Sequence, residues 1–110
     1  MTPDEYVFSA LLTSGLPGTK YAWPLGGAPA LPWFTYKHRR GGEVFADDST
    51  YEKMRRYEVN LYEREQDDGV RESLEEALGK IGPYAEEDSW ITSENCWVTS
   101  YSVTYHHNQT

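Results

Sequence analysis

The segment "CWVTSYSVTYHH", Cys96 to His107, alternates between bulky residues and small polar ones, and this alternation constrains the fold more than any other feature. Successive side chains of a β-strand point to opposite faces of the sheet. One face of this segment would carry Trp97, Thr99, Tyr101, Val103 and Tyr105. The other would carry Cys96, Val98, Ser100, Ser102, Thr104 and His106. The pattern predicts a strand over residues 94–106 that turns its bulky face to the core and its small polar face to solvent or a partner.

A second alternating segment, "YEVNLYERE", predicts another long strand. Tyr57, Val59 and Leu61 alternate there with more polar neighbours, the period of two expected when one face is buried. This strand should run from near Tyr51 to Arg64, long enough to project beyond the core. Further strands are expected at residues 33–38 and 84–91, with a tight turn at residues 92–94. The Pro- and Gly-rich segment over residues 15–33 should be irregular, with at most a short strand near residues 21–23, and a short strand can resume at residues 43–46.

A capped helix is predicted over residues 2–14. Thr2 suits the N-cap, Pro3 suits the first helical position, and Glu5 can complete a capping box with Thr2. Gly15 follows as a C-terminal glycine. Apolar residues at three- and four-residue spacing give one face for packing, made of Val7, Ala10 and Leu11.

The segment "DDGVRESLEEALGKIG" predicts a second helix. Asp67 or Asp68 can cap its N-terminus, and Gly82-Pro83 ends it. Its apolar residues recur with helical spacing and form one continuous stripe, made of Val70, Leu74, Ala77, Leu78 and Ile81.

These elements predict one domain over residues 1–110 of the α+β class. A mainly antiparallel sheet of four to five strands, with both helices packed on one face, is the simplest way to bury two amphipathic stripes. The strand–helix–strand step around residues 70–81 can also place one parallel pair in that sheet.

The charge balance excludes some partners. Ten Lys and Arg against eighteen Asp and Glu give a formal charge of −8, which argues against a general phosphate-backbone binder and against an anionic membrane. A single cysteine cannot form an internal disulfide, which fits a reducing compartment. No apolar run approaches the roughly 20 residues that span a bilayer. The composition indicates a soluble, cytosolic, acidic domain.

No group of residues predicts catalysis, a cofactor or a metal site. Cys96 and His106 would lie about 33 Å apart along a strand, at about 3.3 Å per residue, so they cannot ligate one metal. His106 and His107 point to opposite faces. Asp47-Asp48 has no third ligand at helical or strand spacing. We therefore expect no catalytic residue, no cofactor-binding residue and no bound metal.

Two charged segments leave alternatives open. His38, Arg39 and Arg40 form either a solvated turn or a basic spot suited to an acidic partner. The acidic residues between positions 63 and 88 form either a solvated helix face or a surface for a basic partner, or even a nucleic-acid mimic.

The order of short features resembles a family of small proteins from tailed-phage and prophage structural modules, of the tail terminator, tail completion or minor tail type. The features are a capped helix ending in "SGLP", then "KYAW", "PWFTY", "VFADDSTYEKMRRYEVNLYERE", a helix with "LEEAL", and "SENCWVTSYSVTY". They extend over most of the chain. The segment "LGGAPAL" is richer in Gly and Ala than the resemblance leads us to expect.

The resemblance implies an α+β virion subunit that forms a ring, commonly a hexamer, at the head-proximal end of the tail tube. Such a ring stops tube polymerisation and contacts the head connector. Partners would be further copies of the chain, the major tail tube protein and head connector proteins, without a membrane or specific nucleic acid, although DNA would pass through the lumen. Such subunits are assembled in the bacterial cytoplasm, are located in the virion tail and are not enzymes.

Exposed aromatic residues and arginines on loops or strand ends are the expected contact residues for this role. They are Trp23, Trp33, Tyr36, His38, Arg39, Arg40, Phe45, Tyr51, Arg55 and Arg56. The alternative hypothesis is a small acidic inhibitor that occupies a basic groove of a host or competing protein.

Overall fold

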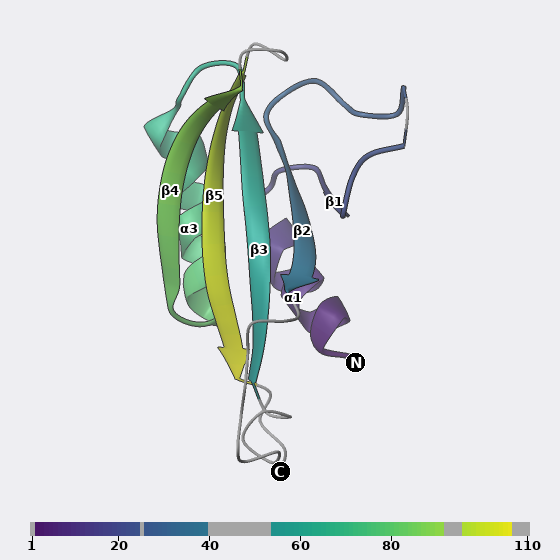
Figure 1. Cartoon of the computed structure of the whole chain (residues 1–110), viewed down its shortest axis with the longest axis vertical. Helices are drawn as coiled ribbons and strands as arrows, with labels where there is room; N and C mark the ends of the chain where they lie inside the picture. Colours follow the sequence, from purple (N-terminus) through teal and green to yellow (C-terminus); the bar gives the residue numbers. More distant parts are fainter. Residues whose placement is uncertain (1, 25, 40–53, 92–95, 107–110) are drawn as a thin grey trace.

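The chain folds into a five-stranded sheet with two helices on one face (Figure 1). The computed structural model describes residues 2–24, 26–39, 54–91 and 96–106. Strand order is β1-β2-β3-β5-β4, and all neighbours are antiparallel except β1 and β2. The expected α+β class, mainly antiparallel sheet and one-sided helices are confirmed. The elements are α1 (Pro3–Leu12), β1 (Gly18–Lys20), β2 (Trp33–Arg39), β3 (Met54–Glu63), α3 (Asp68–Ile81), β4 (Tyr84–Ile91) and β5 (Cys96–His106).

The core lies between the two helices and one face of the sheet. On this helix-side face, cross-strand rows place Phe34 beside Leu61, and Val59 between Tyr36 and Tyr101. Such directly opposed side chains are the stabilising pairs of an antiparallel sheet. The buried apolar cluster combines these rows with the helical stripes and consists of Val7, Ala10, Leu11, Phe34, Tyr36, Tyr57, Val59, Leu61, Leu74, Leu78, Ile81, Tyr101 and Val103.

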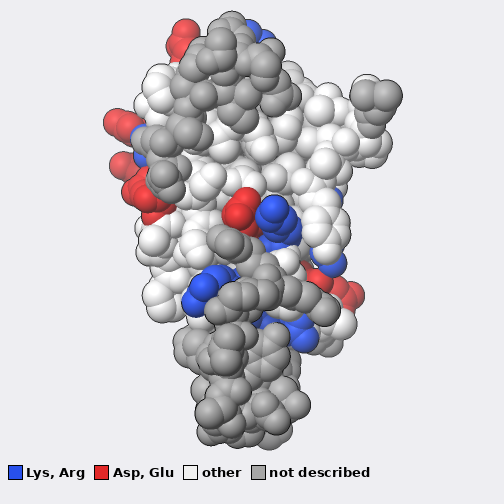
Figure 2. Space-filling model, viewed as in Figure 1, with Lys and Arg blue, Asp and Glu red and all other residues white. Residues whose placement is uncertain are grey.

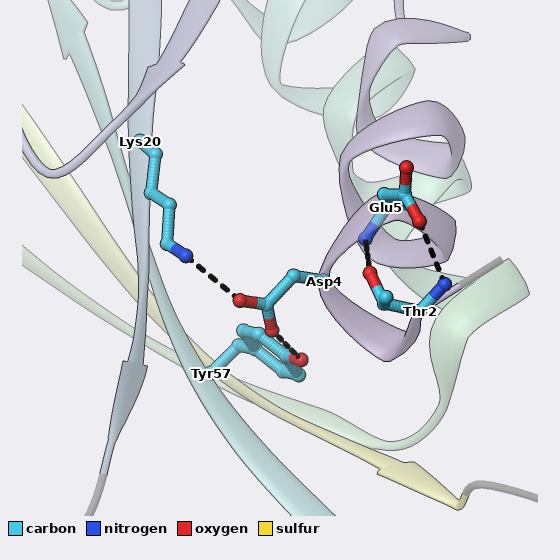
Figure 3. Close-up of polar contacts among 5 residues, drawn as sticks. All are labelled: Thr2, Asp4, Glu5, Lys20 and Tyr57. Carbon is cyan, nitrogen blue, oxygen red and sulfur yellow. Dashed lines mark hydrogen bonds and ion pairs between the residues drawn. The ribbon is translucent and has the colours of Figure 1, made fainter.

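The N-terminus of α1 is held by the expected capping box. The backbone N–H of Glu5 donates to Thr2 Oγ1 at 3.1 Å, and the backbone N–H of Thr2 donates to Glu5 Oε1 at 2.8 Å (Figure 3). The helix ends two residues earlier than expected. The hydroxyls of Thr13 and Ser14 donate to the carbonyls of Ala10 and Leu11, and these bonds satisfy two of the last carbonyls of the helix.

Asp4 joins α1 to the sheet (Figure 3). One carboxylate oxygen accepts a hydrogen bond from Tyr57 Oη at 2.5 Å, and the other accepts one from Lys20 Nζ at 2.8 Å. Partial burial raises the pKa of Asp4, but the bonds from Lys20 and Tyr57 outweigh it, and the pKa lies below its usual value. Burial and the bond to Asp4 raise the pKa of Tyr57. The three side chains hold β1, β3 and the first turn of α1 together.

The second helix, α3, is tied to the strands around it at several points. Asp67 is its N-cap and accepts hydrogen bonds from the backbone N–H groups of Gly69 and Val70. Its own backbone N–H donates at 3.1 Å to Glu63, the buried last residue of β3. Tyr101 of β5 donates to Glu75 of α3 at 3.0 Å. These bonds fix where α3 begins and how it lies across β5.

The structure corrects two expectations about the sheet. The short strand allowed near residues 21–23 lies instead at Gly18–Lys20, where β1 pairs with Phe34 to Tyr36 of β2. Gly18 has no Cβ and so fits against the ring of Phe34. The parallel pair is β1 with β2, since β5 lies between β3 and β4 and separates the strands on either side of α3. The strand expected at residues 43–46, the start of the long strand near Tyr51 and the turn at residues 92–94 lie outside the described residues.

The Asp4 contacts predict a pH-dependent stability. The pKa of Asp4 is lower in the folded protein than in the unfolded chain, where it is near 4. The stabilisation that ionised Asp4 gives the fold is therefore fully present above the unfolded pKa and is lost as the pH falls through the folded pKa. Asp4→Asn should lower the free energy of unfolding by about 1–2 kcal/mol at neutral pH, and the deficit should shrink toward about pH 2. Urea unfolding followed by circular dichroism tests this, with Glu65→Gln as an exposed control. A deficit that stays constant with pH would contradict it.

The close approach at Gly18 predicts a large effect of one methyl group. A Cβ at this position would lie 2.0 Å from the Phe34 ring, which is in the core, whereas a Cβ at Gly79 meets nothing within 4 Å. Gly18→Ala should lower the free energy of unfolding by about 1–3 kcal/mol. Gly79→Ala, in the interior of α3, should raise it by about 0.5–1 kcal/mol. Equal effects of the two substitutions in thermal unfolding would disprove this account of β1.

Candidate functional site

The candidate functional surface is the face of the sheet that points away from both helices, here called the open face. An antiparallel sheet can pack one face on a core and expose the other. Figure 2 views the molecule from this side: most of the described surface is uncharged, and acidic and basic side chains lie close together near its middle. Its residues alternate with the core residues of β2, β3 and β5 and are Trp33, Thr35, Lys37, Arg56, Glu58, Asn60, Tyr62, Val98, Ser100, Ser102 and Thr104. Thr35 and Val98 are buried, and the others are at least partly exposed.

Three aromatic residues form a cluster at one end of the open face. Trp33 of β2 and Tyr62 of β3 are directly opposed, and their ring centroids lie 4.5 Å apart. Trp23, from the segment between β1 and β2, meets Trp33 edge to face at 5.8 Å. All three side chains are half-buried. Trp23, Trp33 and Tyr62, here called the aromatic cluster, therefore present large rings with part of their area still exposed.

Polar side chains form the middle of the open face. Ser100 donates to Asn60 Oδ1 at 2.7 Å, and Asn60 Nδ2 donates to Glu58 at 3.1 Å. Lys37 Nζ lies 3.8 Å from the same Glu58 carboxylate, with 48% of the Lys37 side chain exposed. At that exposure the ion pair contributes little to stability. The middle of the face thus offers donors and acceptors already held in place by their neighbours.

The remaining end of the open face is basic. Arg56 of β3 is exposed and lies opposite Arg39 of β2 in the strand register. The open face therefore changes from aromatic, through polar, to basic along the strands.

Several residues predicted as contact residues lie elsewhere. Tyr36 was expected to be exposed near a strand end, but it is 5% exposed and stacks on Phe8 of α1 at 5.2 Å, because it shares the helix-side face with Phe34. His38 also lies on that face, 5.3 Å from the Tyr57 ring. Arg55 alternates with Arg56 and shares the face of Tyr57.

The predicted contact residues that the structure brings together on the open face are Trp23, Trp33 and Arg56, with Arg39 in register beside Arg56. Tyr62 belongs to the aromatic cluster although it is not among the predicted contact residues. Its place in "YEVNLYERE", on the same strand face as Glu58 and Asn60, was the available signal. Arg40, Phe45 and Tyr51 lie outside the described residues.

Other features of the described residues bear on possible chemistry. Cys96 and His106 are the two ends of β5, and Cys96 is buried. Within the described ranges, no three His, Cys, Asp or Glu side chains are grouped so that they could hold a metal ion, and no helix is both long and apolar enough to cross a membrane. A cleft of about 140 Å³ lies beside the β3–α3 junction, smaller than the roughly 300–1,000 Å³ of typical ligand pockets.

Comparison with known proteins leaves the family open. No protein-family model matches this chain, and no curated protein matches its sequence significantly. The resemblance to phage tail proteins, the absence of enzymatic activity and the expected partners therefore stay predictions.

The register predicts energetic coupling within the aromatic cluster. Because Trp33 and Tyr62 are directly opposed at 4.5 Å, a double-mutant cycle of Trp33→Ala and Tyr62→Ala should give a coupling free energy of about 0.5–1.5 kcal/mol. The control cycle pairs Trp33→Ala with Tyr6→Ala, whose ring stacks on Tyr105 near α1, and should be additive within about 0.5 kcal/mol. Equal coupling in both cycles would argue against the cluster.

Proposed function

We propose that this chain is a structural subunit of a tailed phage or prophage, a tail terminator or tail completion protein that self-associates into a ring. The ring would stop polymerisation of the tail tube and contact the head connector. The open face carries this proposal, because it presents a rigid, mostly uncharged surface that no helix of the described residues covers. The family resemblance of the sequence supports the same role.

The physical character of the open face suits contacts between proteins. Half-buried Trp and Tyr rings supply large contact area at small conformational cost, and aromatic residues and Arg are enriched in interfaces. The strands β3 and β5 pair over ten residues, which keeps the face rigid, and the start of β3 and the end of β5 extend beyond α3 (Figure 1). A rigid surface loses little conformational entropy when it binds. Partners in this role are further copies, the tail tube protein and the connector.

The second candidate is an acidic inhibitor, and the exposed face of α3 favours it. Asp68, Glu72 and Glu76 are exposed on this helix. Carboxylates gathered on one surface raise the rate of association with a basic groove, and this effect weakens with salt. A monomer that binds a basic protein tightly would fit this candidate and not the ring.

The oligomeric state of the chain tests the first proposal. Size-exclusion chromatography with light scattering should give a ring, about 76 kDa for a hexamer of 12.7 kDa chains, and electron microscopy should show it. Ser102→Arg places a long side chain in the middle of the open face, directly opposite Glu58, and should weaken association at least about tenfold because its bulk holds the two surfaces apart. Ser9→Arg, the same change on the exposed side of α1, should leave the mass unchanged. A monomer at every concentration would refute the ring.

A further inference from the structure

The two edges of the sheet differ in how much backbone they leave open. The edge strand β1 has only three residues, and the carbonyl of Lys20 already accepts a hydrogen bond from the backbone N–H of Ala22 at 2.8 Å. The opposite edge strand, β4, has eight residues, and within the described residues no strand pairs with its outer side. Short edges resist addition of a further strand, whereas a long regular edge is a template for one.

The register of β4 shows which backbone groups are open. The backbone N–H of Thr104 donates to the carbonyl of Pro83 at 3.1 Å, so position 83 and every second residue after it point toward β5. Tyr84 and Glu86 therefore direct their backbone N–H and C=O outward, as do positions 88 and 90. This open row extends over most of the strand.

The surroundings of this edge are acidic. Glu86 is exposed and forms an ion pair at 3.0 Å with Arg71 of α3. Beyond that pair, α3 contributes three exposed carboxylates, those of Asp68, Glu72 and Glu76. Figure 2 shows the acidic side chains gathered along the side of the molecule where Figure 1 places β4 and α3.

A second copy of this chain is a poor occupant for the β4 edge. The sequence has three successive acidic residues at positions 86–88, in the middle of β4. Antiparallel pairing of two β4 strands about this centre would set like charges against each other, which destabilises cross-strand pairs. Pairing with β1 of another copy would offer only three residues. Charge complementarity instead favours a strand that carries lysine or arginine.

We propose that the open edge of β4 binds an extended, basic segment of a partner protein, which adds to the sheet as a sixth strand. The backbone groups of Tyr84 and Glu86, and those at positions 88 and 90, pair with the incoming segment. Its lysine or arginine side chains stand at every second position, on the side that faces Glu86 and α3. Backbone pairing supplies affinity in this mode, and alternate side chains supply specificity.

This binding goes beyond the proposed ring and uses a different surface. The ring depends on the open face, whereas the added strand needs only the β4 edge. Ser102→Arg on the open face should therefore leave binding at the edge intact. A variant that no longer forms the ring but still binds the peptide, or the reverse, separates the two proposals.

A synthetic peptide of about ten residues with alternating lysine and threonine is a suitable probe, since this is the length of a long strand. A control peptide has the same composition in two blocks, and another has a central proline that removes a donor. Fluorescence anisotropy should show the alternating peptide binding about threefold to tenfold more tightly than the proline peptide, the equivalent of one hydrogen bond. Nuclear magnetic resonance should show slower amide exchange at Glu86.

Two substitutions at one position separate charge from backbone pairing. Glu86→Gln removes the charge and should weaken peptide binding about twofold to fivefold. Glu86→Pro also removes the outward N–H, which an edge strand tolerates, and should weaken binding a further threefold to tenfold. Thermal unfolding checks that both variants fold.

Three results would overturn the proposal. They are equal binding of the alternating, block and proline peptides, equal affinities of the two Glu86 variants, and resonance changes on α3 without changes at Tyr84 and Glu86. Any of these would mean that the carboxylates attract the peptide's cations without addition of a strand. The acidic residues would then serve only to keep other strands from pairing with β4.

Discussion

The ladder between β3 and β5 is the interaction on which the rest of this structure depends. It pairs ten residues of each strand, from Met54 with His106 to Glu63 with Trp97. On one side its rows give the apolar surface that both helices cover, and on the other they give the open face. A shift of one residue would exchange the two faces, sending Val59 outward and Asn60 inward. β2 and β4 extend the ladder on either side, so their faces are set by it too.

Local patterns were enough to predict the long elements. The capping box at Thr2 and Glu5 and the stripe of α3 involve residues within a few positions of one another, and the alternation around Val59 and Tyr101 is equally local. Nothing local indicates β1, because its three residues form a strand through pairing with Phe34 to Tyr36 of β2, which are distant in the sequence. The placement of β5 between β3 and β4 is likewise a property of the whole chain.

The candidate surface was harder to predict than the fold, for the same reason. Trp33 and Tyr62 are far apart in sequence and meet only once β2 and β3 have paired in one register. Tyr36 was misplaced because burial depends on which face a residue occupies and not on its distance from the strand end. Residue type alone predicts Trp23, Trp33 and Arg56 as contact residues. They lie on one face only because β2 and β3 pair in a particular register, and this register cannot be read from the sequence.

The order of the strands also has a consequence for synthesis of the protein. β5 comes last among the strands but lies inside the sheet. A chain emerging from the ribosome can form α1 and pair β2 with β3 early, while the apolar residues Tyr57, Val59 and Leu61 of β3 still lack their neighbours from β5. Long-range pairing of this kind is slow compared with helix formation. Interrupted translation before Cys96 leaves β4 without the strand it pairs with, so β4 joins the sheet only in chains completed through β5.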